Sequence, residues 1–212
     1  MSASRGHGGL RWPNVSLAIE IRKTWRSWHN RAVSPHSRFE LTVPIDEADH
    51  VLGEPHAPVS VVEFGDFECP NCKQAAPAVQ VLFDRFPGRI RFAYRHFPAE
   101  VVHPHALPAA EVSEVAGAQG RFWAMHNMLF DNQLHLKAPQ LRGYAERLQL
   151  DMARYAAELD DHIYLQRIRE HAQAARNSGA RGTPTFFVNG IIQDVSFGVH
   201  QLFKAVEKAL RR

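Results

Sequence analysis

The stretch Glu63-Phe64-Gly65-Asp66-Phe67-Glu68-Cys69-Pro70-Asn71-Cys72 decides the fold, because it holds the only two cysteines among 212 residues. Residues 59–64 at its start are rich in β-branched and aromatic side chains, which predicts a buried strand. Residues 73–86 after it carry apolar side chains at helical spacing. A Cys-x-x-Cys pair between a strand and a helix is typical of redox chemistry.

The two cysteines are predicted to differ in reactivity. Cys69 falls at the cap of the helix and Pro70 in its first turn, where a missing N–H costs nothing. Unpaired backbone N–H groups and the helix dipole then favour the Cys69 thiolate, which is the attacking form. Asp66 and Glu68 are negative charges nearby and oppose this effect. Cys72 lies one turn further on, where we expect it to be less exposed and to act as the resolving sulfur.

Charge is distributed unevenly along the chain. Residues 1–40 contain seven Lys or Arg and two acidic residues, whereas the remainder contains 18 basic and 20 acidic residues. The positive net charge therefore belongs to the first 40 residues. A solvated basic arm is the preferred interpretation of this segment over contact with nucleic acid or anionic lipid.

The composition fits a folded domain outside the membrane. An apolar content of 45% is enough for a full core, and no run of about 18 uncharged apolar residues predicts a membrane span. The most apolar piece near the N-terminus, residues 15–21, is short, contains Glu20 and precedes no small-residue cleavage site. Since two cysteines also form no structural disulfide framework, we expect a cytoplasmic protein with no nucleic-acid partner.

The first part of the chain predicts few regular elements. Apolar side chains within residues 17–32 have the spacing of a short amphipathic helix. Residues 39–43 alternate in polarity and predict an edge strand. Residues 44–58 contain three prolines and predict a connection.

The remainder predicts a β-α-β unit, a helical stretch, a hairpin and a final helix. Helix 71–86 contains Pro77, which should bend it. We infer an extension (1–40), a first half of a domain (41–98), a helical insertion (99–179) and a second half (180–212). The predicted elements are strands 59–64 and 89–95, helices 71–86, 104–118, 122–130, 139–148, 152–159 and 162–177, hairpin 183–192 and helix 200–212.

The chain resembles the DsbA-like branch of the thioredoxin superfamily. The resemblance rests on residues 62–72, on His103-Pro104-His105-Ala106, on Gln119-Gly120-Arg121-Phe122-Trp123 and on Gly182-Thr183-Pro184-Thr185-Phe186-Phe187-Val188-Asn189-Gly190. It implies an α/β thioredoxin fold with an inserted all-helical subdomain. A similar domain is also found fused to some sodium/proton antiporters.

This resemblance implies roles for individual residues. Pro184 is expected as a cis-proline that faces the cysteine pair, with Thr183 holding the backbone of an extended substrate. Glu63 matches a buried acid that relays protons to the resolving cysteine; the alternative is a hydrogen-bonded strand residue with no such role. Asn71 stands where strongly oxidising members have histidine, so the charge of that ring is absent here.

Further substrate contacts are expected around the cysteine pair. Pro70 and Asn71 lie between the two sulfurs, and Phe67 and Phe97 are candidates for an apolar groove. His103 is a candidate contact to the cysteines or the substrate at the start of a helix. No organic cofactor and no metal are expected, because the redox-active group is a Cys69–Cys72 disulfide.

We therefore predict a thiol-disulfide oxidoreductase that acts on protein or small-molecule thiols and disulfides. One alternative is a glutathione-dependent isomerase or transferase of the same fold, although such relatives usually lack the second cysteine. Another is a non-enzymatic scaffold or metal-binding module. Its zinc ligands would be Cys69, Cys72, His103 and His105.

Overall fold

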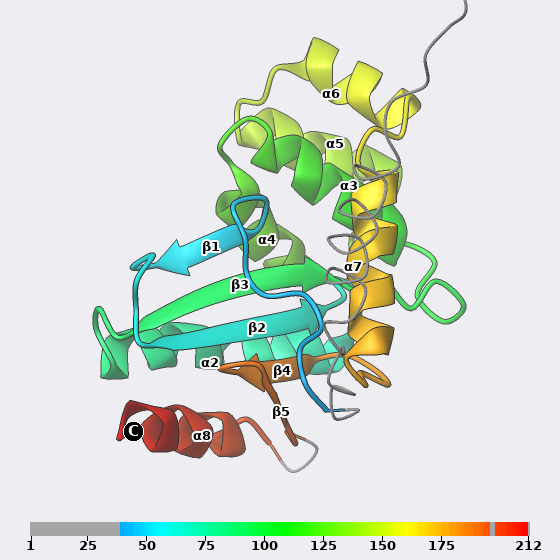
Figure 1. The fold of residues 1–212 in the computed structure, drawn as a ribbon. Helices are drawn as coiled ribbons and strands as arrows, with labels where there is room; N and C mark the ends of the chain where they lie inside the picture. Colours follow the sequence, from blue (N-terminus) through cyan, green and yellow to red (C-terminus); the bar gives the residue numbers. More distant parts are fainter. Residues whose placement is uncertain (1–38, 196–197, 212) are drawn as a thin grey trace, which may run out of the picture. The chain divides into compact units, whose positions relative to one another are not determined.

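The computed structural model describes residues 39–195 and 198–211, and these residues form a five-stranded mixed sheet with helices packed on it (Figure 1). The strand order is β1-β3-β2-β4-β5, and the order along the chain keeps a run of helices between β3 and β4. The strands are β1 (His50–Gly53), β2 (Val59–Gly65), β3 (Ile90–His96), β4 (Thr185–Val188) and β5 (Ile191–Gln193). The helices are α2 (Pro70–Arg85), α3 (Ala106–Gly117), α4 (Phe122–Asp131), α5 (Ala138–Arg147), α6 (Met152–Asp160), α7 (Leu165–Asn177) and α8 (His200–Leu210).

The centre of the sheet is the parallel pair β2 and β3, flanked by the antiparallel strand β4. Val59 lies opposite Ile90 in the parallel register, and Glu63 lies opposite Phe186 in the antiparallel one. Most side chains of β2 and β3 are buried. Strands buried on both faces have near-continuous apolar sequences, which is the pattern that predicted β2.

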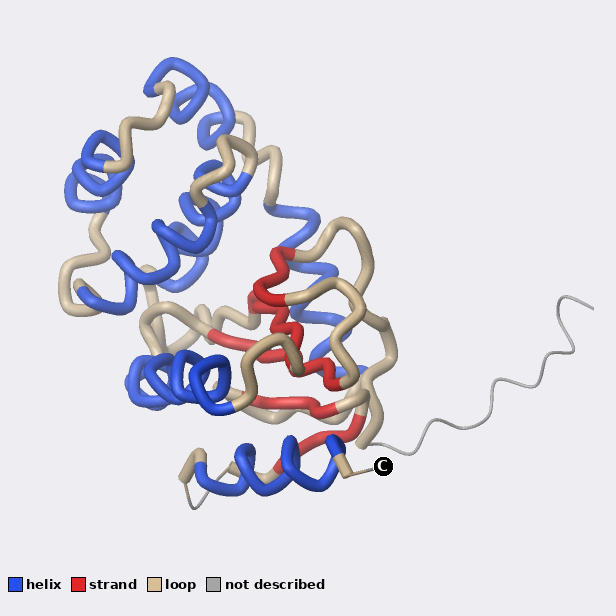
Figure 2. Tube along the Cα trace, turned by 90° about the vertical axis from the view of Figure 1, so that its left-hand side faces the viewer, coloured by secondary structure: helices blue, strands red, loops and turns tan. Residues whose placement is uncertain are grey.

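Successive residues of β2 contribute to two separate cores. Val61 packs into the larger cluster with side chains of α2, α3, α4 and α8, whereas Val62 packs into the smaller cluster with Ala174 and Ala175 of α7. The alternation of side chains along a strand explains this division. Helices α3 to α6 group together to one side of the strands (Figure 2).

The thioredoxin-type fold with helices between β3 and β4 confirms the predicted architecture, but two short elements differ from prediction. Residues 50–53 were expected in a connection and instead form β1, which pairs antiparallel with β3. Residues 39–43 were expected as an edge strand, but Glu40 makes only an isolated bridge to Ile191. Both segments depend on partners distant in sequence, so local pattern was a poor guide to them.

The amphipathic helix predicted within residues 17–32 lies outside the described residues. Among the helices that are described, none combines the length and the apolar character needed to cross a membrane.

Arg95 anchors the segment before β1 to the sheet. Its guanidinium group donates to both carboxylate oxygens of Asp49, at 2.7 and 2.6 Å, and to the carbonyls of Val43 and Pro44. Both side chains of the ion pair are 2% exposed. Burial alone would raise the pKa of Asp49, but Arg95 lowers it below the ordinary value. Asp49 is therefore ionised in the folded protein.

We predict that Asp49→Asn, which keeps the side-chain volume, lowers the free energy of unfolding by about 3–5 kcal/mol, because it leaves the buried guanidinium without a counter-charge. Urea unfolding measures this change. Glu47→Gln, at an exposed position of the same segment, is the control and should change stability by less than about 0.5 kcal/mol. Equal stability of the two variants would contradict the role given to Arg95.

A second buried polar group, His126, lies in an aromatic cluster between the sheet and the helical segment. Its ring is 5.7 Å from Phe67, 4.8 Å from Tyr94 and 4.9 Å from Phe130, centroid to centroid. The Nε2 atom is buried with no hydrogen-bond partner. Burial lowers the pKa of His126 to about 4, so the folded chain holds a neutral ring.

This pKa predicts acid sensitivity of the fold. Between pH 6.5 and about 4 the unfolded chain binds a proton at His126 that the folded chain does not, so stability is lost as the pH falls through this window. The His126→Phe variant lacks this contribution to the loss of stability at low pH. The unfolding free energy of the variant relative to the parent should therefore grow by about 1.4 kcal/mol per pH unit of acidification in this window.

Urea unfolding of both proteins at a series of pH values measures the difference. His135→Phe, at an exposed position, is the matched control and should leave the pH dependence of the parent unchanged. A difference between His126→Phe and the parent that stays constant from pH 7 to 4 would show that His126 is not held neutral.

Candidate active site

The two cysteines occupy the start of α2, directly after β2. Cys69 is the residue before the first helical turn, and Pro70 is the first residue within it. This arrangement confirms the predicted helix start. Cys69 is 6% exposed and Cys72 is fully buried, and both are free thiols. The expected difference in exposure is therefore present, though small.

Cys69 is the more acidic thiol. The largest contribution is a hydrogen bond from the Cys72 thiol, which favours the Cys69 thiolate. The Thr183 side chain and the backbone N–H groups of Cys72 and Asn71 act in the same direction, whereas burial opposes them. The Thr183 carbonyl, 3.3 Å from Cys69 Sγ, accepts from the thiol and also favours the protonated form. The donors prevail, and the pKa of Cys69 falls to about 5.

Cys72 has the opposite character. Burial raises its pKa well above the ordinary value, and the hydrogen bond to Cys69 and the charge of Glu63 add to this shift. The backbone N–H of Asp66 lies 3.5 Å from Cys72 Sγ. Among the contributions to the pKa of Cys72, this hydrogen bond is the one that lowers it. At neutral pH the pair therefore consists of a thiolate at Cys69 and a thiol at Cys72.

The segment before β4 faces the cysteine pair. The Thr183–Pro184 peptide bond is cis, and Thr183 O contacts Cys69 Sγ. Asn71, Thr183 and Pro184 line one hollow of about 370 Å³, which Val195 and Val199 complete. The structure thus brings Asn71, Thr183 and Pro184 together around this hollow, and Thr183 O connects it to Cys69.

Glu63 lies beneath the pair in β2. It is 2% exposed, and its Oε1 atom is buried with no hydrogen-bond partner. Burial, followed by the negative charge of Cys69, raises the pKa of Glu63 to about 8. The alternative role of Glu63, a strand residue held by hydrogen bonds, does not explain why Oε1 has no hydrogen-bond partner.

Asp66 connects the cysteine loop with the segment after β3. Its carboxylate accepts from Glu68 N at 2.8 Å, from Ala99 N at 2.9 Å and lies 2.7 Å from His103 Nδ1. Glu68 in turn accepts from His105 N at 2.6 Å. His103 is therefore bound to the cysteine loop through Asp66.

The predicted apolar groove of Phe67 and Phe97 is wrong for Phe67, whereas Phe97 is partly buried. Phe67 is 1% exposed and packs against Tyr94 and Phe130, so α4 covers it. Phe97 packs against the smaller core on the α7 face. Gln133, which was not predicted as a site residue, contacts the cysteine loop: its Nε2 donates to Phe67 O at 2.8 Å and to Cys69 O at 2.9 Å.

The zinc alternative finds no support in the geometry. Among the described residues, the side chains that gather within metal-binding distance are His96, Glu114 and His171, not the four residues of that alternative. In this cluster Glu114 already lies 3.0 Å from His50 Nε2, 2.8 Å from His96 Nε2 and 3.4 Å from Arg167 Nε. The guanidinium charge next to the carboxylate works against a cation there.

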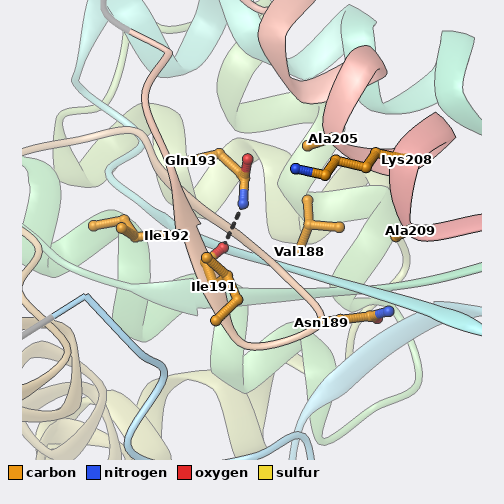
Figure 3. Close-up of a pocket in the computed structure, with 8 residues that line it drawn as sticks. All are labelled: Val188, Asn189, Ile191, Ile192, Gln193, Ala205, Lys208 and Ala209. Atoms are coloured by element: carbon orange, nitrogen blue, oxygen red, sulfur yellow. Dashed lines mark hydrogen bonds between the residues drawn. The ribbon is translucent and has the colours of Figure 1, made fainter. Parts of the chain in front are cut away.

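A separate hollow of about 330 Å³ lies between the β4–β5 hairpin and α8 (Figure 3). Val188, Ile191 and Ala205 supply apolar walls, and Lys208 extends from α8 toward β5. Its lining includes none of the predicted site residues. This hollow is therefore separate from the predicted site.

Comparison with known proteins agrees with this geometry. A family model described as Thioredoxin matches residues 46–208. The chain is 48% identical over 172 residues to the Na(+)/H(+) antiporter NhaA 1 of Salinispora arenicola, a match that covers 81% of this chain and 26% of the antiporter. The chain therefore spans about a quarter of the length of this relative.

Solved structures show the same fold. Oxidised BdbD from Bacillus subtilis superposes with a TM-score of 0.71 at 22% identity, over 82% of this chain and 99% of that one. A thioredoxin-like oxidoreductase from Silicibacter pomeroyi DSS-3 gives a TM-score of 0.65 at 27% identity, over 79% of this chain and 95% of that one. Because the family model matches residues 46–208, the chain belongs to the thioredoxin family, and its fold with the helical insertion is that of BdbD.

Proposed function

We propose that this chain is a thiol-disulfide oxidoreductase in which Cys69 attacks and Cys72 resolves. The observation that carries the proposal is the opposite proton affinity of two free thiols one turn apart, with the pKa of Cys69 at about 5 and that of Cys72 raised. A thiolate is the nucleophile in disulfide exchange, and a buried thiol beside it is protected until the first step is complete.

The reaction balances in two exchanges. The Cys69 thiolate attacks one sulfur of a substrate disulfide, which forms a Cys69–substrate bond, breaks the substrate S–S bond and releases one substrate thiolate. Cys72 loses its proton and attacks the Cys69 sulfur, which closes the Cys69–Cys72 bond and releases the second substrate thiolate. The substrate gains two electrons and the dithiol loses two. Oxidation of a substrate dithiol follows the reverse course.

Glu63 is the proposed acceptor of the Cys72 proton. Its pKa of about 8 leaves a minor ionised fraction at neutral pH. Part of that elevation comes from the Cys69 charge, which disappears when Cys69 enters a mixed disulfide. The ionised fraction of Glu63 therefore rises at the stage when Cys72 must lose its proton. The substrate backbone is proposed to lie against Thr183 and Pro184, beside Pro70 and Asn71.

We predict that the parent protein catalyses the reduction of insulin by dithiothreitol and that Cys69→Ser lowers the rate to the uncatalysed level, because the attacking sulfur is gone. Cys72→Ser should instead accumulate a mixed disulfide with substrate, detectable by mass spectrometry under non-reducing conditions. Inactivity of the folded parent in this assay and in exchange with glutathione would refute the proposed function. The equilibrium constant with glutathione then distinguishes a reductant from an oxidant.

We predict that Glu63→Gln slows resolution of a preformed Cys69 mixed disulfide by about 100-fold, the low end for loss of a positioned proton acceptor. In the parent, the resolution rate should increase with pH through the pKa of Glu63, which falls below about 8 once the Cys69 charge is gone, and this inflection should be absent in the variant. Stopped-flow release of a fluorescent thiol measures both. The alkylation rate of Cys69 at neutral pH is the control and should not change, since Glu63 is mostly neutral there. Unaltered resolution would remove Glu63 from the proton path.

A further inference from the structure

The surroundings of Cys69 contain acidic residues but no cation within the Cys-x-x-Cys segment. Asp66 and Glu68 precede Cys69 in the same loop, and the two residues between the cysteines, Pro70 and Asn71, are uncharged. Negative charges close to a thiol favour its protonated form. A positive charge from another part of the chain would offset them.

His103 is held in a position to supply that charge. Its Nδ1 atom lies 2.7 Å from Asp66 Oδ2. The carboxylate is itself fixed, because it also accepts from Glu68 N and Ala99 N and is buried. A histidine against a buried, fixed carboxylate is stabilised in its doubly protonated form.

His103 also lies beside the residues that flank Cys69 on either side. His103, Glu68 and Pro70, the residue after Cys69, line one hollow of about 430 Å³. The side chain of His103 is 21% exposed, so water screens its charge only in part. Burial alone would lower the pKa of His103, but Asp66 and then the Cys69 thiolate raise it above the ordinary value.

We propose that His103 is a positioning residue for the chemistry proposed above: as an imidazolium held by Asp66, it stabilises the Cys69 thiolate in place of the charge that Asn71 does not provide. This proposal rests on the proposed function. It gives Asp66, which follows β2, and His103, which follows β3, a role in setting the redox equilibrium. It develops the sequence-based prediction that His103 contacts the cysteines or the substrate.

Other charged groups face the same region. Glu68 has its Oε2 bound by His105 N, which compensates part of its charge. Lys137 and the His105 ring line the hollow without a hydrogen bond to Asp66. Glu63 faces the pair from the β2 side and raises the pKa of Cys72. His103 differs from Lys137 and His105 in having a buried carboxylate that fixes its charged ring.

The proposal requires reciprocal coupling. If charged His103 lowers the pKa of Cys69 by a given amount, the Cys69 thiolate must raise the pKa of His103 by the same amount. Formation of the Cys69–Cys72 disulfide removes the thiolate, so the pKa of His103 should be lower in the oxidised protein than in the reduced one. A purely structural contact between His103 and Asp66 produces no such difference.

The experiment measures the pKa of Cys69, by thiolate absorbance, in the parent and in His103→Gln. We expect a rise of about one unit, the low end for an opposite charge near a thiolate, since His103 is partly exposed. At a pH above the Cys69 pKa of both proteins and below the His103 pKa of the reduced parent, the equilibrium with glutathione should shift about tenfold toward the disulfide in the variant. His105→Gln and Lys137→Gln are matched controls on the same hollow and should leave the pKa of Cys69 unchanged.

A second measurement needs no variant. NMR titration of the His103 ring in isotopically labelled parent protein should give a pKa about one unit lower in the oxidised form than in the reduced form. Equal values in the two forms, or equal Cys69 pKa values in His103→Gln and the parent, overturn the inference and leave the proposed function intact. An inactive parent overturns the proposed function, while the thiolate titration still tests the coupling.

Discussion

The chemistry of this molecule depends on how little chain separates β2 from α2. The strand ends at Gly65 and the helix begins at Pro70, so Cys69 becomes the capping residue and Cys72 enters the first turn. Free backbone N–H groups at a helix start stabilise an anion. One turn of helix therefore gives two identical side chains opposite proton affinities: Cys69 receives donors from Cys72 and Asn71, whereas Cys72 is buried beneath it.

Three carboxyl groups surround this pair and could have cancelled the effect of the helix start. The negative charge of each is removed or offset by its surroundings. Glu63 is buried with no hydrogen-bond partner at Oε1, and its pKa of about 8 keeps it mostly protonated at neutral pH. Asp66 is saturated by two backbone N–H groups and His103, and Glu68 is bound by His105 N. The loop can therefore be acidic in sequence and still support an acidic thiol.

The sequence predicted those parts of the site that local rules determine. A proline in the first helical turn, a run of β-branched and aromatic residues and the Cys-x-x-Cys spacing each act within a few residues, and the structure has them where they were expected. The resemblance to DsbA-like proteins supplied what local rules could not, such as the cis peptide bond at Pro184. Long-range contacts were missed: β1 exists because it pairs with β3, and His103 binds a carboxylate 37 positions away.

The error at Phe67 shows why the site could not be completed from the sequence. A phenylalanine beside a reactive cysteine is an equally good candidate for a substrate groove or for a core, and only the location of α4 decides between them. In the fold, α4 brings Phe130 and His126 over the ring, so Phe67 joins the aromatic cluster.

The loop after this helix brings the insertion into contact with the cysteine loop. The loop after α4 places the Gln133 amide against the carbonyls of Phe67 and Cys69. Gln133 is buried, so both carbonyls obtain a partner where water has little access. The start of α2 is thus held from two sides: by Asp66 from within its own loop and by Gln133 from the insertion. Because the acidity of Cys69 depends on the orientation of backbone N–H groups at that point, the helical insertion helps to set the proton affinity of a sulfur that belongs to the thioredoxin core.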